Sequence, residues 1–248
     1  MNFLEMTSGD IRELDRSQIT ILFPIAAIEQ HGPHLPTGTD TIICDALASA
    51  VESRLQDRVL RLPTQWLGAS SHHLRFGGTL DSPLPTYIDM LCQTVDPLLK
   101  NGFRRVLILN GHGGNIDPMR VALRRLQADW TDALLAAAAY WSIAAQAISD
   151  ILEGPDRFVG HACEAETSLI MHLRPELVRQ DALAGAEGWL PDDIEGMFVC
   201  RDMHQRTAAG CTGRPDLSTA TKGERLFEAI TDRVIAAIER LQDEPLPA

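Results

Sequence analysis

One stretch constrains the fold of this chain more than any other: an apolar run that ends in acidic and imidazole side chains. Residues 19–28 are almost all apolar and several are β-branched, which is typical of a strand buried on both faces of a sheet. Glu29, His31 and Asp40 follow within a loop shaped by glycine and proline. Ligands of open α/β sheets bind at the carboxyl ends of the strands, so these side chains predict a site at that edge.

The side chains in this loop are of the kind that bind metal ions. Oxygen and imidazole ligands together suit Zn, Mn or Fe, and the absence of thiolates argues against a closed structural zinc site. A buried, ionised Glu29 is costly unless it is paired or bound to a metal. We therefore interpret Glu29, His31 and Asp40 as metal ligands, and His34 as support for the loop.

Segments with strand and helix character alternate along the rest of the chain. Further strands are predicted at 59–63, 105–109 and 133–140, and helices at 7–14, 41–55, 85–100, 117–130, 142–152, 166–173 and 221–241. This alternation predicts an α/β fold, a three-layer α/β/α arrangement around a mainly parallel central sheet. Asp40 and Asn115 are candidate N-caps for the helices that follow them. The poorly periodic segment 181–217 is predicted to be irregular.

Length and charge limit the classes of partner. The 248 residues contain nothing that resembles a linker or a repeat, so we expect a single domain over residues 1–248. A hydrophobic content of 45% is enough for a sizeable core. The 22 basic and 34 acidic residues give a net charge of −12, which disfavours binding to nucleic acid or to anionic membranes.

The sequence also indicates a cytoplasmic location. Residues 1–10 carry acidic side chains and no apolar core of a signal peptide, and no apolar stretch is long enough to span a membrane. The five cysteines are odd in number and show no CxxC spacing, so we expect reduced thiols. Cys163 is interpreted as a small packing residue.

Three blocks of sequence together resemble the creatininase family of amidohydrolases. They are EQHGPHLP at 29–36 with Asp40 following, NGHGGN at 110–115 and HACEAETS at 161–168. Their order and approximate spacing are those of the family, and the resemblance extends from roughly residue 5 to roughly 240. It implies two divalent metal ions per chain, with zinc as first choice and manganese or iron as alternatives, and a homohexamer.

The resemblance assigns ligand roles to four residues, Glu29, His31, Asp40 and His112, and Asp40 would bridge the two metals. In creatininase a glutamate two residues after the last of these supplies a further ligand, whereas this chain has Gly114 there. We predict that Glu166 replaces it. Glu164 is the fallback ligand, or a general acid/base.

Other positions are matched to the reaction and to the substrate pocket. His161 matches the active-site histidine of the family, and an imidazole suits protonation of a departing nitrogen. Trp141 matches an aromatic residue of the substrate pocket, and His73 lies in a segment that resembles part of that pocket. A pocket tryptophan of creatininase corresponds to Arg157 here. Together with Gly114, this change predicts that creatinine itself is not the substrate.

The predicted function is that of a metal-dependent amidohydrolase. Its dinuclear site would activate water to hydrolyse an amide or cyclic amide C–N bond in a small polar substrate. Four alternatives remain open: a formamidopyrimidine deformylase-like enzyme, a short-peptide hydrolase, a hydrolase of a sugar-like ring carbonyl, and a non-catalytic metal-binding assembly subunit.

Overall fold

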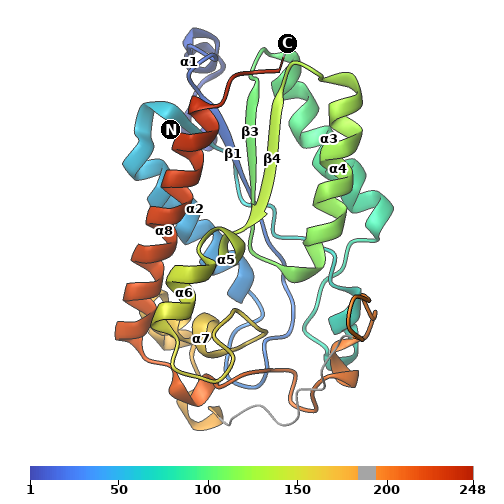
Figure 1. Ribbon diagram of the computed structural model, residues 1–248, viewed down its shortest axis with the longest axis vertical. Helices are drawn as coiled ribbons and strands as arrows, with labels where there is room; N and C mark the ends of the chain where they lie inside the picture. The colour runs from blue at the N-terminus through green and yellow to red at the C-terminus, as the bar shows by residue number, and fades with distance from the viewer. Residues whose placement is uncertain (184–193, 248) are drawn as a thin grey trace.

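The computed structural model describes residues 1–183 and 194–247. Its central sheet has four strands in the order β2-β1-β3-β4, and every strand pair is parallel. The strands are β1 (Thr20–Ile25), β2 (Val59–Arg61), β3 (Arg105–Asn110) and β4 (Leu134–Ala139). Figure 1 shows α3 and α4 on one side of the sheet and α2 and α8 on the other. The predicted three-layer α/β/α fold with a parallel sheet is confirmed.

The helices occur close to the positions that the apolar periodicity predicts. Their bounds are α1 (Ser8–Glu13), α2 (Thr39–Leu55), α3 (Leu84–Lys100), α4 (Ile116–Asp129), α5 (Tyr140–Ile143), α6 (Ala145–Ile151), α7 (Glu164–Leu173) and α8 (Ala220–Asp243). The helix predicted over 142–152 is divided into α5 and α6, which meet at Ala144. None of the helices in the described part of the chain is both long and apolar enough to cross a membrane.

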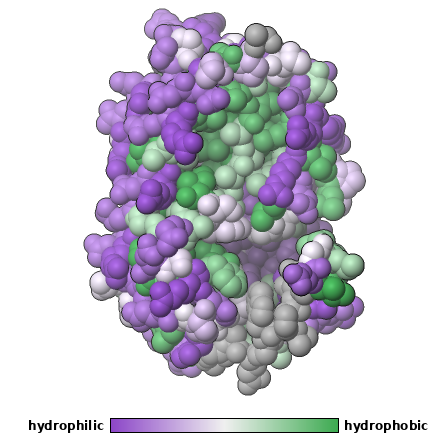
Figure 2. Space-filling model, in the orientation of Figure 1, coloured by the Kyte–Doolittle hydropathy of each residue, from purple (hydrophilic) through white to green (hydrophobic). Residues whose placement is uncertain are grey.

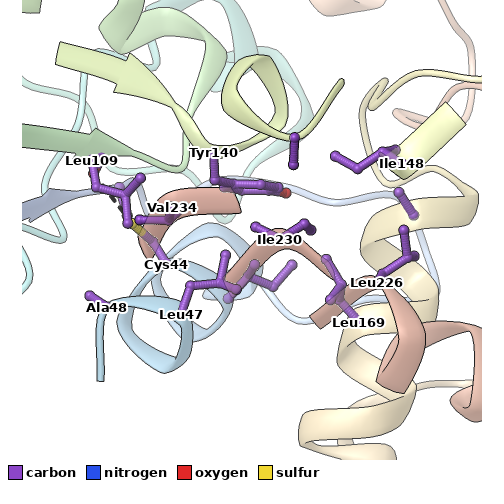
Figure 3. Packing of buried hydrophobic residues seen from close by; sticks show 14 of the residues in the cluster. Cys44, Leu47, Ala48, Leu109, Tyr140, Ile148, Leu169, Leu226, Ile230 and Val234 are labelled. Carbon is purple, nitrogen blue, oxygen red and sulfur yellow. Dashed lines mark hydrogen bonds between the residues drawn. The ribbon is translucent and has the colours of Figure 1, made fainter. Parts of the chain in front are cut away.

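Alternate residues of each central strand face opposite sides of the sheet and supply two separate cores. In β1, Ile21 and Phe23 pack in the core beneath α3 and α4, whereas Leu22 packs in the core beneath α2 and α8. Figure 3 shows the second core, where Cys44 of α2 lies near Val234 of α8. Burial on both faces explains why these strands read as continuous apolar runs.

The topology places two loops next to each other at one edge of the sheet. The chain leaves β1 through α2 on one face, and after β2 it crosses to β3 through α3 on the opposite face. The neighbouring strands β1 and β3 therefore form a switch point, outside which the loops diverge and leave a crevice. The loops that follow β1 and β3 carry the first two sequence blocks.

The first strand is shorter than predicted. Beyond Ile25 the chain pairs with loops: the Ala26 N–H donates to the Gln65 carbonyl at 2.8 Å, and the Ile28 carbonyl accepts from the Leu80 N–H at 2.9 Å. The described part of 181–217 forms short 3-10 turns at Gln180–Ala182, Met203–Gln205 and Pro215–Leu217, and residues 184–193 of the predicted irregular segment lie outside the described residues.

Candidate metal centre

Four elements bring the five predicted ligands together. Glu29 and His31 follow β1, Asp40 lies in the first turn of α2, His112 follows β3, and Glu166 lies in the first turn of α7. All five side chains are buried, with exposures of 1–4%. Residues that are as much as 137 positions apart thus meet at the carboxyl edge of the sheet.

The ligand-type atoms of these residues converge. The Asp40 carboxylate lies between two rings, with Oδ1 3.0 Å from His31 Nε2 and Oδ2 3.2 Å from His112 Nδ1. Glu29 Oε2 is 3.2 Å from the same His112 nitrogen, and Glu166 Oε1 is 3.9 Å from His31 Nε2. Each close contact is between a carboxylate oxygen and an imidazole nitrogen.

The imidazoles of His31 and His112 each contact a backbone carbonyl on the side that faces away from the cluster. His31 Nδ1 lies 3.1 Å from the Glu29 carbonyl oxygen, and His112 Nε2 lies 3.0 Å from that of Ala69. An N–H that donates to a carbonyl leaves the opposite ring nitrogen bare, and this is the usual arrangement behind a metal-bound histidine. In both rings the other nitrogen points into the cluster, where a cation can take the place of a proton.

Several buried atoms of the cluster have no hydrogen-bond partner among the described residues. They are Glu29 Oε2, His31 Nε2, Asp40 Oδ2 and Glu166 Oε2. Unpaired buried polar atoms are costly, and a cation among them removes that cost. Two triads of mutually close donor atoms, Glu29–Asp40–His112 and His31–Asp40–Glu166, share Asp40. A third grouping joins Glu29 and His31 to His161.

Electrostatics couples the titration of these groups. Burial alone would favour neutral rings, but Asp40 raises the pKa of His31 well above its ordinary value, and Glu29 and Asp40 raise that of His112 to about 10. Burial raises the pKa of Glu29. Burial acts in the same direction on Asp40, but the two rings outweigh it and hold its pKa well below the usual range. Without metal, protons therefore occupy His31 and His112.

Two further histidines lie beside Glu29. His73 Nε2 is 3.3 Å and His161 Nδ1 is 3.6 Å from Glu29 Oε1. Burial, reinforced by His31, lowers the pKa of His161 well below its ordinary value, and burial together with His72 lowers that of His73 to about 2. Both rings are therefore neutral at pH 7.

A cavity of about 790 Å³ adjoins the cluster. Glu29, Asp40, His112, His161 and Glu166 contribute to its wall. The rest of the wall includes apolar side chains, among them Leu84, Ile88, Val121, Trp141 and Phe158. Several of these are well exposed, with Leu84 at 54% and Phe158 at 53%, so they surround the mouth while the buried cluster lies at the inner end.

The sequence matches the family described as "Creatininase: Creatinine amidohydrolase" over residues 4–238. The chain belongs to the creatininase family. A mycofactocin precursor peptide peptidase of Mycobacterium ulcerans is 30% identical, with 97% of this chain and 93% of that protein covered. A 3-dehydro-scyllo-inosose hydrolase of Thermotoga maritima is 30% identical, with 93% and 80% covered.

Solved structures agree with the family membership. A putative creatinine amidohydrolase from Bacteroides fragilis superimposes with a TM-score of 0.82 at 28% identity, and the match covers 99% of this chain and 98% of that one. The predicted enzyme class, a metal-dependent creatininase-like amidohydrolase, is confirmed.

The structure explains the glycine at the position of the additional creatininase ligand. A Cβ on Gly114 would lie 2.1 Å from the Ala69 carbonyl oxygen and 2.5 Å from His112 Nε2. A side chain at this position would displace the contact that orients His112. The carboxylate of Glu166, on the α7 helix formed by the third sequence block, lies near His31, and its replacement of the missing ligand stays a prediction.

Glu164 does not lie with the cluster, which corrects its prediction as fallback ligand or acid/base. Its carboxylate forms a buried ion pair with Lys222 of α8 and accepts hydrogen bonds from the Glu153 N–H at 3.0 Å and the Gly154 N–H at 2.9 Å. Both oxygens are thus satisfied on the side of α7 that faces α8. Glu164 therefore connects α7 to α8 and to the segment that contains Glu153 and Gly154.

The capping prediction for Asp40 is wrong, and that for Asn115 holds only for its position, since Asn115 is the N-cap of α4 but its side chain makes no capping hydrogen bond. Helix α2 begins at Thr39, so Asp40 lies inside its first turn. The N-cap is Gly38, which has no side chain that could cap the helix. Asn115 precedes α4 but donates from Nδ2 to the Ala26 carbonyl at 3.0 Å and accepts from the Ala69 N–H at 3.0 Å. It joins the loops on either side of the site, which no local pattern in the sequence indicates.

The remaining predicted residues lie near the cavity or away from it. Trp141 in α5 forms part of the cavity wall, as its pocket prediction requires, with Tyr140 edge-on at 4.9 Å. His34 Nε2 is 3.0 Å from Thr167 Oγ1 and so connects its loop to α7. Cys163 is buried in the core beneath α2 and α8, and Gln30, which sequence reasoning passed over, contacts two site histidines.

Proposed function

We propose that this protein hydrolyses an amide bond at a dinuclear metal centre. Glu29, Asp40 and His112 would hold one cation, His31, Asp40 and Glu166 the other, with Asp40 shared. One observation carries the proposal: unpaired buried donor atoms converge as two triads on a common carboxylate at the inner end of a cavity. Two cations that share a ligand can act on one substrate.

The donor set fits divalent ions of intermediate hardness. Three carboxylates and two neutral imidazoles, without thiolate, favour Zn, with Mn or Fe as alternatives. When bound, such ions lower the pKa of water from 15.7 towards about 7 and polarise a carbonyl oxygen. The three carboxylates nearly balance the charge of two divalent cations, which suits a buried position.

His161 is the candidate for proton transfer. Its Nδ1 faces Glu29 Oε1 from the cavity side, and its lowered pKa keeps the ring neutral. A neutral imidazole beside the centre can take the proton of the nucleophile and deliver it to the departing nitrogen. His73, whose ring lies beside that of His161 and approaches the same oxygen of Glu29, is proposed to contact the substrate together with Trp141.

The cavity favours a short peptide over a small polar ring. Its volume of about 790 Å³ and its apolar mouth provide room and contact area for side chains on either side of the bond that is cleaved. Exposed Phe158, Leu84 and Val121 would bury apolar substrate groups. The relative named as a precursor peptide peptidase supports this choice, whereas an apolar mouth offers little to a polyhydroxylated ring.

Metal analysis and a peptide panel test the proposal together. We expect about two metal ions per chain, and zinc-dependent cleavage of short peptides with Phe or Leu beside the bond at higher kcat/KM than of matched Asp peptides. Val121→Asp should remove this preference, whereas Leu4→Asp, on an exposed residue outside the cavity wall, should not. A ratio of one metal, or no cleavage by fully loaded protein, would contradict the proposal.

A homo-oligomer is also proposed, and the open edge of the sheet supports it. Among the described residues, strand β4 pairs on one side only, and Figure 2 shows apolar side chains gathered on the face where this edge lies. Unpaired edge strands are ready templates for association with another chain. Light scattering should then give a multiple of 27.3 kDa, six-fold for the hexamer that the resemblance implies.

A further inference from the structure

Gln30 lies between two predicted ligands in the sequence and is buried, with 7% exposure. Its backbone N–H donates to Thr79 Oγ1 at 3.0 Å, which fixes the main chain. Its side-chain oxygen accepts the Gly32 N–H at 3.0 Å. Because a backbone N–H can only donate, this contact identifies the oxygen end of the amide and directs the NH2 group the other way.

The NH2 group of Gln30 faces two imidazoles. Its nitrogen is 2.8 Å from His73 Nδ1 and 2.9 Å from His161 Nε2. A side-chain amide has two N–H donors, so it can serve both rings at once. The ring centroids of these two histidines are only 4.4 Å apart, so one amide determines how both rings are turned.

The second nitrogen of each ring lies near the same carboxylate oxygen. His73 Nε2 and His161 Nδ1 both approach Glu29 Oε1, at 3.3 and 3.6 Å. A neutral ring that accepts a bond at one nitrogen carries its proton on the other, so His73 presents an N–H to this carboxylate. His161 Nε2 is also 2.8 Å from the Gln30 carbonyl oxygen, so either tautomer of that ring finds its partner on Gln30.

The Gln30 amide occupies space that is open only because residue 210 is a glycine. Gly210 has φ +73°, and a Cβ built on it would lie 2.2 Å from Gln30 Oε1 and 3.0 Å from its Cδ. Any side chain at this position would therefore displace the amide. Gly77 has nearly the same φ, +75°, with no atom within 4 Å of its Cβ position, so Gly77→Ala is the control for a methyl group at a positive φ without a steric contact.

We propose that Gln30 is a positioning residue of the hydrolase: its amide orients the imidazoles of His73 and His161 against Glu29, and Gly210 leaves the space that the amide needs. The reaction part of this proposal rests on the function proposed above. The structural part does not, because the orientation of the rings can be measured without turnover.

The first experiment is NMR of the zinc-loaded protein with 15N-labelled histidine. In the wild type, long-range ring correlations should show His73 as the single tautomer protonated at Nε2. Gln30→Leu and Gly210→Ala should convert the His73 signals to averaged tautomers and favour the His161 tautomer protonated at Nε2, whose N–H the carbonyl of residue 30 still accepts, while Gly77→Ala leaves both rings unchanged. His73→Ala and His161→Ala assign the signals. Unaltered signals in Gln30→Leu would overturn the proposal.

The second experiment measures turnover of the best peptide from the panel. Residues that orient an active-site group typically contribute 10–100-fold, so kcat of Gln30→Leu and Gly210→Ala should fall by about that factor. The metal ratio should stay as in the wild type, which a general loss of structure would not allow, and KM should rise because His73 is proposed to contact the substrate. Equal kcat in all variants would refute the role in the reaction. Absence of turnover in the wild type would count against the proposed function and leave the NMR result standing.

Discussion

The metal centre and the Glu164–Lys222 pair are two buried acidic sites on the same helix, α7, and they differ in what satisfies their oxygens. Glu164 binds an ammonium group and two backbone N–H groups. Glu166, two residues later, faces an imidazole at 3.9 Å and keeps Oε2 without a partner among the described residues. Their exposures, 3% and 4%, are almost equal.

Burial alone therefore does not separate a structural carboxylate from a ligand. The distinction lies in the donors around each one. A carboxylate whose lone pairs are all occupied by protein N–H groups has no capacity for a cation, whereas one that faces bare imidazole nitrogens and other carboxylates is arranged for a cation. The following predictions test whether the two sites divide in this way.

The largest effect is expected from removal of a ligand at the centre. His112→Ala eliminates one imidazole of the Glu29–Asp40–His112 triad and should lower metal affinity by more than about 100-fold, beyond the loss typical of residues behind a ligand. Activity should disappear with the metal. Elemental analysis after dialysis measures the number of metal ions per chain, with His204→Ala as the control. Full metal content in His112→Ala would show that His112 is not a ligand.

The second effect separates the two glutamates. Glu164→Gln removes the buried carboxylate beside the Lys222 ammonium, which keeps the more exposed Glu153 carboxylate and the Leu217 carbonyl, and should cost about 3 kcal/mol, or roughly 6–12 °C in Tm, without change in the metal ratio. Glu166→Gln should show the reverse, a lower metal ratio with little loss of stability in the metal-free protein. Thermal unfolding and metal analysis of both variants decide it. If Glu164→Gln loses metal while Glu166→Gln keeps it, our assignment is inverted.

A smaller loss of stability is expected when Asn115, which connects the loops beside the metal centre, is replaced. Asn115→Ala leaves the Ala26 carbonyl and the Ala69 N–H without their buried partner and should destabilise the protein by about 1–3 kcal/mol. Denaturant unfolding measures this value. Asn101→Ala, which removes an exposed bond to the Pro97 carbonyl, is the matched control and should change little.

The most gradual effect is on pH dependence. In the metal-free protein the raised pKa values of His31 and His112 stabilise the fold fully below the unfolded value near 6.5, and this contribution is lost as pH rises towards about 10. With zinc bound, protons no longer occupy these nitrogens, so stability should rise as pH increases. Tm measured at pH 7 and pH 9 in both states should therefore show slopes of opposite sign. Parallel slopes would mean that the metal lies elsewhere.

The structure brings together the ligand-type residues that the sequence singled out, whereas two predictions for the residues around them needed correction. Glu29, His31, Asp40 and His112 were predicted from short motifs at strand ends, and Glu166 from the gap at Gly114. Glu164 was misassigned, because two acidic residues in one helix turn look alike until their neighbours are known. The side chain of Asn115 was misread as a cap, because its partners lie 89 and 46 residues away.

The sequence by itself determined the α/β alternation, the two-sided burial of the strands, and the identity of the ligand-type residues at their carboxyl ends, since periodicity and motif spacing are local properties. Only the tertiary structure decided which nitrogen of each imidazole faces the centre, which glutamate is satisfied by Lys222, and that Gln30 contacts two histidines. Those features depend on hydrogen bonds between residues far apart in the chain, whose geometry is fixed when the loops after β1 and β3 meet at the switch point.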